Sequence, residues 1–197
     1  MGIVFLEFQL NTMPRLTKSE IDAEIIDRAA GLFAKHGFEH TSLQQIADAV
    51  NYSKAGLLHH YPSKKAIYEK ALSTGVDQMR AVLAQVEGAP IGKERDLAVV
   101  EAMIQMALDW PGLSAFTNQL TQNEQNIEPA LTEMGLIMYS ALGIDTASIS
   151  IDRMIRVTVA FTGLGVTAAL SARLDLKREW RPYIVQTAME ALGHGDR

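Results

Sequence analysis

The chain has 197 residues, a hydrophobic fraction of 48% and a formal net charge of −5. This length fits a small helical unit joined to a larger body, and it is long enough to bury a sizeable core. Because the chain contains no cysteine, disulfides, thiol catalysis and cysteine-rich zinc sites are excluded.

Residues 1–12 are apolar, but they carry no basic residue and Glu7 interrupts them. A secretory signal peptide begins with a basic segment, so we do not expect one here. Met13 starts the more polar stretch MPRLTKSE. We therefore expect residues 1–14 to be either a flexible N-terminal arm or an extension that results from assigning the translation start upstream of Met13.

A first helix is predicted after Thr17, which forms a capping-box pattern with Glu20. Gly37 is expected to end this helix, and Phe38 can fold back onto it. The apolar residues at helical spacing are Ile21, Ile25, Ala29, Leu32 and Phe33.

A second, shorter helix is predicted from a capping box of Ser42 and Gln45, with Thr41 and Gln44 offering the same pattern one residue earlier. Its apolar side consists of Leu43, Ile46, Ala47 and Val50. Asn51 follows where the turn needs a left-handed residue, a conformation that asparagine tolerates better than most residues.

The third predicted helix spans residues 54–60, capped by Ser53, with Leu57 and Tyr61 directed into the core. Pro62 stops it, and Ser63 caps the next helix. Two short helices joined by a tight turn form the outline of a helix-turn-helix, which places its second helix in the major groove of DNA.

The stretch TSLQQIADAVNYSKAGLLHHYPSKKAIY at residues 41–68 resembles the DNA-binding domain of the tetracycline-repressor (TetR) family, and the resemblance covers residues 16–72. The family usually has glycine at the position of Asn51 and a small apolar residue at that of Tyr52. The alternative is an ordinary three-helix bundle that does not bind nucleic acid.

Contacts with DNA follow partly from local chemistry and partly from this resemblance. Thr41 and Ser42 lie at a helix N-terminus, where backbone N–H groups and a hydroxyl can bind a phosphate. The resemblance implies that Lys64 contacts a phosphate, and that base edges are read from Gln44 and the start of the third helix. Leu58 stands where relatives usually carry a phosphate-contacting tyrosine. The predicted DNA-binding residues are Thr41, Ser42, Gln44, Ser53, Lys54, Ala55, Gly56, His59, His60 and Lys64, the two histidines being expected to contact backbone.

Charge is distributed unevenly along the chain. Residues 41–70 contain four basic and two acidic residues, a net +2, whereas residues 71–197 contain 10 basic and 15 acidic residues, a net −5. A mildly basic DNA-binding segment in an otherwise acidic chain favours sequence-specific DNA binding over sequence-independent binding to phosphates.

Helical patterning continues to the C-terminus, with helices expected at about 63–86, 93–109, 113–121, 128–142, 148–174 and 177–192. The predicted fold is therefore all-α with about nine helices. We expect a helix-turn-helix domain at residues 15–62 and a ligand-binding and dimerisation domain at 63–197. The uncharged run between Arg156 and Arg173 has 16 residues, short of the roughly 20 that span a bilayer. We expect it to be a helix buried by protein.

The last two helices are the predicted dimer interface, since small residues let another backbone approach and the ninth helix carries an apolar stripe. The alternative is that these residues pack only within one subunit. The interface set is Ala160, Gly163, Thr167, Ala168, Tyr183, Ile184, Thr187, Ala188 and Ala191. A two-fold dimer reads half-sites roughly 34–36 Å apart.

The resemblance also implies a cavity for a small regulatory molecule among the fourth to eighth helices. Methionine side chains are flexible and line adaptable apolar sites well, although the same residues are also ordinary core. The candidate lining residues are Met79, Met103, Met106, Trp110, Phe116, Met134, Met138, Tyr139, Met154, Thr158 and Phe161. No buried cationic cluster is visible in the sequence, which favours a neutral or lipophilic effector.

No metal or catalytic site is predicted. His36 and His40 are four residues apart, but Gly37 breaks the helix that would align them, and no nucleophile elbow or phosphate-binding glycine motif appears. The sequence thus predicts a cytoplasmic, dimeric, ligand-responsive repressor of a pseudo-palindromic DNA operator, with no cofactor and no membrane partner. The alternatives are a DNA-binding regulator without a small-molecule switch, and an all-helical enzyme or carrier.

Overall fold

The computed structural model of the chain describes residues 17–122 and 128–195. Within these ranges it contains nine α-helices and no strand, which confirms the all-α prediction. The helices are α1 (Lys18–His36), α2 (Leu43–Ala49), α3 (Lys54–His60), α4 (Lys64–Val86), α5 (Lys93–Asp109), α6 (Pro111–Thr121), α7 (Pro129–Ala141), α8 (Ile151–Arg173) and α9 (Lys177–Met189), followed by a π-helical turn, Glu190–His194. The predicted arm at residues 1–14 lies outside the described residues.

The N-terminal unit, α1–α3, is fixed by the local signals that the sequence displays. Thr17 and Glu20 form a complete capping box at the start of α1, and Gly37 ends that helix with a φ of +80°. Side chains from all three helices meet in one core with the first turns of α4 and with α6. Its largest buried residues are Phe33, Ile46, Leu57, Ile67 and Phe116.

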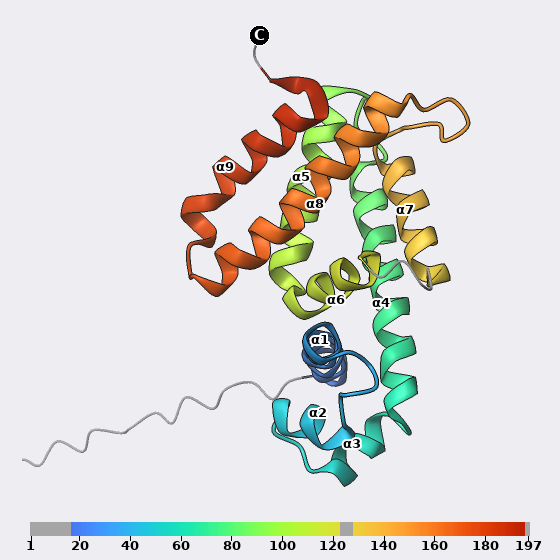
Figure 1. Ribbon diagram of the computed structural model, residues 1–197, viewed down its shortest axis with the longest axis vertical. Coiled ribbons are helices and arrows are strands. Elements are labelled where there is room, and N and C mark those ends of the chain that lie inside the picture. Colours follow the sequence, from blue (N-terminus) through green and yellow to red (C-terminus); the bar gives the residue numbers. More distant parts are fainter. Residues whose placement is uncertain (1–16, 123–127, 196–197) are drawn as a thin grey trace, which may run out of the picture.

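The body, α4–α9, lies above this unit in Figure 1, and α4 runs from one into the other. Helix α7 packs along α4, α8 packs against α5, α6 and α9, and α6 lies across the base of the body against α1. The body core is a second cluster that draws on α4, α5, α7, α8, α9 and the C-terminal turn.

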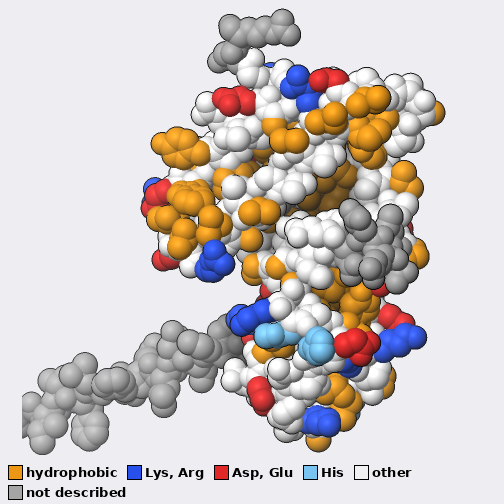
Figure 2. All heavy atoms as spheres, in the orientation of Figure 1, with side chains coloured by type: hydrophobic (Ala, Val, Ile, Leu, Met, Phe, Trp, Pro, Cys, Tyr) orange, Lys and Arg blue, Asp and Glu red, His pale blue; other side chains and the backbone are white. Residues whose placement is uncertain are grey.

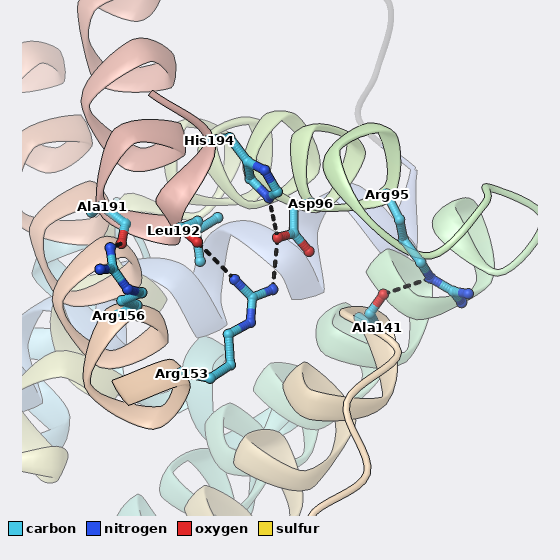
Figure 3. Close-up of polar contacts among 8 residues, drawn as sticks. All are labelled: Arg95, Asp96, Ala141, Arg153, Arg156, Ala191, Leu192 and His194. Carbon is cyan, nitrogen blue, oxygen red and sulfur yellow. Dashed lines mark hydrogen bonds and ion pairs between the residues drawn. The ribbon is translucent and has the colours of Figure 1, made fainter. Parts of the chain in front are cut away.

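A buried carboxylate ties the C-terminal turn to the body core. Asp96 on α5 is 1% exposed, and its Oδ2 accepts hydrogen bonds from Arg153 on α8 at 2.6 Å and pairs with His194 Nε2 at 2.7 Å. Arg153 also donates to the Leu192 carbonyl at 2.9 Å (Figure 3). The C-terminal segment is therefore held to two helices by hydrogen bonds as well as by apolar contact.

Helix α8 is less buried than its uncharged sequence led us to expect. Only 28% of its most apolar window is buried, and it is the one helix in the described residues that is long and apolar enough to span a membrane. One side packs into the body through Val157, Ala160 and Leu164. The opposite side exposes a row of large apolar residues, namely Ile151, Ile155, Val159 and Val166.

Candidate DNA-binding and ligand sites

The turn between α2 and α3 has the geometry that its residues predict. Ser42 caps α2 in a capping box with Gln45, and Asn51 adopts the left-handed conformation with a φ of +57°. Ser53 caps α3, accepting a hydrogen bond from the Gly56 N–H at 3.0 Å. Leu57 is fully buried, so the opposite side of this short helix faces outward.

Most of the predicted DNA-binding residues share this outward surface. Gln44 is exposed, and its amide nitrogen donates to Asp48 at 2.7 Å, which leaves its oxygen free to accept. Gly56 is partly exposed at the first turn of α3. The exposed members of the set are Ser42, Gln44, Ser53, Lys54, Ala55 and His59.

Two of the predicted side chains, those of Thr41 and His60, are directed elsewhere. Thr41 is 1% exposed and its hydroxyl donates to the Gly37 carbonyl at 2.8 Å, so this hydroxyl fastens a loop and does not face DNA. His60 stacks on Tyr52 with ring centroids 5.5 Å apart, and its Nδ1 lies 3.5 Å from the Asp22 carboxylate. Both side chains therefore serve the packing of the N-terminal unit.

Lys64 also makes internal contacts that the sequence did not predict. Its ammonium donates to the carbonyls of Phe38 and Glu39 and lies 4.3 Å from the centre of the Phe38 ring. The neighbouring Lys65 is exposed, and its one ion pair with the described residues is a surface pair with Glu69 at 3.6 Å. Lys65 is a phosphate-binding candidate that the sequence analysis missed, and its place in the first turn of α4 is the signal that could have found it.

The N-terminal unit and the body are joined at the start of α6. The Leu113 N–H donates to Asp27 Oδ1 at 2.9 Å, and a Cβ on Gly112 would collide with the Asp27 carbonyl. Burial raises the pKa of Asp27, opposed by hydrogen bonds from the N–H groups of Leu113 and Gly112. Helix α6 can approach α1 this closely only because residue 112 has no side chain.

A methionine-rich cavity lies in the body among α4, α5, α6 and α7, with a volume of about 230 Å³. It brings together six of the predicted ligand-binding residues: Met79, Met103, Met106, Trp110, Met134 and Met138. Several other lining residues are small or polar and resemble ordinary helix positions, so the sequence does not single them out: Gly75, Ser114, Thr117, Thr121 and Gly135.

The other five predicted ligand-binding residues lie away from this cavity. Phe116 points from the other side of α6 into the core around Phe33, and Tyr139 and Phe161 pack against the body core. Met154 and Thr158 are exposed on α8. Helix α8 contributes no residue to the lining of this cavity, because its inward side packs on α5 and α6.

An apolar surface groove runs between α8 and α9, with a volume of about 470 Å³. It is lined by every predicted dimer-interface residue except Ala168, together with Val159, Leu164 and Trp180. Ala160, Ile184 and Ala188 form its buried floor, whereas Gly163, Tyr183 and Thr187 are exposed on its walls. Figure 2 shows hydrophobic side chains at the surface of this part of the molecule.

Known proteins resemble this chain in both sequence and fold. Residues 25–71 match the family described as bacterial regulatory proteins, tetR family. The negative transcriptional regulator IcaR of the biofilm operon icaADBC from Staphylococcus aureus (strain Newman) is 40% identical over 60 residues, covering 30% of this chain and 32% of that protein. IcaR of Staphylococcus epidermidis is 43% identical over 49 residues, covering 25% and 26%. The chain thus matches about a third of the length of these relatives or less.

Two solved structures share the fold over most of both chains. The probable transcriptional regulatory protein RHA5900 superposes with a TM-score of 0.60 at 19% identity, covering 89% of this chain and 99% of that one. The fatty acid degradation regulator FadR from Bacillus halodurans superposes with a TM-score of 0.58 at 16% identity, covering 92% and 99%. These likenesses show the fold of the chain, and its residues 25–71 are those of the tetR family of bacterial regulatory proteins.

Proposed function

We propose that the protein is a dimeric repressor that binds a pseudo-palindromic DNA operator and leaves it when a small lipophilic molecule enters the body cavity. The observation that carries the DNA-binding part is the α2–α3 unit, whose caps, left-handed turn and buried Leu57 direct Lys54, Ala55 and His59 outward on one short helix. The IcaR relatives are negative regulators, which supports repression over activation.

Base recognition is assigned to the exposed residues of this surface. The side chain of Lys54 suits the acceptors of guanine, and the free amide oxygen of Gln44 suits an exocyclic amino group. Ala55 and Gly56 leave room for a thymine methyl. Phosphate contacts are assigned to the α2 N-terminus at Ser42 and to Lys65, because the ammonium of Lys64 already has internal partners.

Dimerisation is proposed through the α8–α9 groove and the exposed row on α8. An apolar surface of this extent is unusual on a monomer, and covering it with a second copy removes Ile155, Val159 and Tyr183 from water. A helical bundle formed by two subunits is a stable way to bury two such faces. Two copies of α3 related by a two-fold axis would then reach successive major grooves.

Release from DNA is proposed to act through α6. This helix lines the cavity with Ser114 and Thr117, and its first residues touch α1 through the Leu113–Asp27 hydrogen bond. A ligand that prefers a displaced α6 would therefore tilt the N-terminal unit. Allosteric coupling of about 1–3 kcal/mol would weaken operator binding by roughly 5–150-fold.

Selection of bound sequences from a random pool of DNA duplexes tests this proposal. We expect the purified protein to enrich a sequence with two-fold symmetry and half-sites one helical turn apart, and to elute as a dimer. Enrichment of no sequence at any salt concentration would contradict DNA recognition, and a monomeric protein would contradict the dimeric mode. An operator affinity that no cavity ligand alters would support the alternative, a regulator without a small-molecule switch.

A further inference from the structure

One hydroxyl group in the wall of the body cavity is buried and has no hydrogen-bond partner in the described residues. Ser114 lines the cavity from α6, is 6% exposed, and its Oγ makes no hydrogen bond to any residue in the described parts of the chain. A buried polar group without a partner is unfavourable, because it has lost its hydrogen bonds to water without replacing them. A ligand atom that bonded to this hydroxyl would remove that cost.

The other hydroxyls that line the cavity are already engaged. Thr117 donates to the carbonyls of Leu113 and Ser114 at 3.2 and 3.1 Å, and Thr121 donates to the Asn118 carbonyl at 2.8 Å. All three bonds are made within α6 itself. Ser114 is therefore the one lining hydroxyl in the described residues whose proton has no acceptor. Its Oγ is shielded here, and a ligand reaches it when the flexible methionine side chains of the cavity shift.

The remaining lining, as far as the described residues form it, disfavours a charged ligand. The described residues around the cavity are methionine, leucine, glycine, tryptophan and hydroxyl residues, without an acidic or basic side chain. An ion transferred from water into such surroundings loses its hydration without gaining a partner. A neutral, mostly apolar molecule gives up far less favourable hydration when it enters the same cavity.

The volume of the cavity limits the size of the ligand that it can hold. An apolar cavity of about 150 Å³ holds one benzene ring, so a cavity of about 230 Å³ holds about nine non-hydrogen atoms by simple proportion. The flexible side chains of Met79, Met103, Met106, Met134 and Met138 can adjust to chains and to rings of this size.

We propose that the effector is an uncharged, mostly hydrocarbon molecule of about nine non-hydrogen atoms with a single carbonyl or hydroxyl oxygen, which accepts a hydrogen bond from Ser114. This inference rests on the proposed function, since it specifies the ligand of the proposed cavity. It assigns Ser114 as the polar anchor, and the methionines and Trp110 as the apolar enclosure.

The test measures binding of 2-octanone, 1-octanol, octane and octanoate to the full-length protein by calorimetry at neutral pH. These probes have similar chains and differ in their polar end. We expect 2-octanone and 1-octanol to bind more tightly than octane, and octanoate to bind most weakly. Equal affinity of octane and 2-octanone, tightest binding by octanoate, or binding by none of the probes would overturn the proposal.

Two variants test the anchor. Ser114→Ala should weaken 2-octanone about two- to tenfold, the effect of a typical hydrogen bond, and should leave octane unchanged. Thr117→Val is the matched control, because it removes a lining hydroxyl that is bound within its own helix, and it should leave the preference for 2-octanone over octane intact. An equal preference for 2-octanone in wild type and Ser114→Ala would overturn the assignment of Ser114. The comparison of probes on wild-type protein stands even if this variant fails to fold.

Failure of this inference can be told apart from failure of the proposed function. Operator binding is measured on the same samples in the presence and absence of 2-octanone. Normal operator binding with no ligand preference would overturn only the inference about the ligand. Preferential binding of 2-octanone by a protein that binds no DNA would overturn the proposed function and leave the ligand chemistry intact.

Discussion

The Asp27 carboxylate on α1 accepts a hydrogen bond from the Leu113 N–H on α6 at 2.9 Å, which joins residues 86 positions apart in the sequence. This bond lies where the N-terminal unit meets the body. Without this bond, the Leu113 N–H at the start of α6 and the half-buried carboxylate of Asp27 would each lose a hydrogen-bond partner. The contact therefore fixes the position of α6 relative to α1.

Asp27→Asn is expected to keep this hydrogen bond and to remove the cost of a buried charge. Burial raises the pKa of Asp27 in the folded protein. Protonated Asp27 therefore favours the folded state, and this contribution is complete at a pH below the pKa of the unfolded chain. It is lost as the pH rises through the higher pKa of the folded protein. At pH 7 the variant should be as stable as wild type or more stable, and the difference should shrink as pH falls toward 4. Urea unfolding across this pH range checks the prediction. A constant loss of stability at every pH would contradict it.

Lys64 and Lys65 are neighbours with different expected roles. Lys64→Ala removes charge-assisted hydrogen bonds to the Phe38 and Glu39 carbonyls and should destabilise the protein by about 1.5–3 kcal/mol. Lys65→Ala removes an exposed pair and should change stability by less than about 1 kcal/mol. Instead, Lys65→Ala should make the affinity for DNA less sensitive to salt concentration, by the amount expected for the loss of about one phosphate contact. Unfolding curves and salt titrations of operator binding distinguish the two, and the reverse pattern would refute this assignment.

Arg153→Met should be strongly destabilising because it leaves Asp96 buried without its cationic partner. Asp96 is 1% exposed, and Arg153 donates to it at 2.6 Å (Figure 3). Removing one member of a buried pair costs about 3–5 kcal/mol. Arg80→Met is the control, because Arg80 pairs with the exposed carboxylates of Asp77 and Glu133 and should cost at most about 1 kcal/mol. Equal losses in the two variants by urea unfolding would argue against a special role for Asp96.

Val159→Glu should separate the dimer. Val159 is 58% exposed and lines the α8–α9 groove, so a second copy would force the new carboxylate into an apolar interface, where an unpaired charge is costly. Sedimentation should show a monomer with weakened operator binding and near-normal helical content. Leu136→Glu is the matched control, because Leu136 is 53% exposed on α7, outside the groove. If Val159→Glu remained dimeric, the proposed interface would be wrong.

Much of the N-terminal unit could be predicted from the sequence because its signals are local. A capping box such as Thr17–Glu20 or Ser42–Gln45 acts within four residues, and Asn51 and Ser53 set the turn by their own backbone preferences. The bounds of α3, residues 54–60, follow from Ser53 before it and Pro62 after it. Chain periodicity and caps therefore determined the helices, their order and the exposed surface of α3.

The partners of individual side chains were decided only by tertiary structure. Thr41 and Lys64 resemble phosphate-binding residues in the sequence, yet their donors are used by the Gly37, Phe38 and Glu39 carbonyls, which the fold brings within reach. Met154 and Met138 have the same side chain, but only the helix that carries Met138 faces the cavity. Local interactions set which residues are helical, whereas the packing of helices far apart in sequence sets which polar groups are satisfied internally and which, like the hydroxyl of Ser114, remain free.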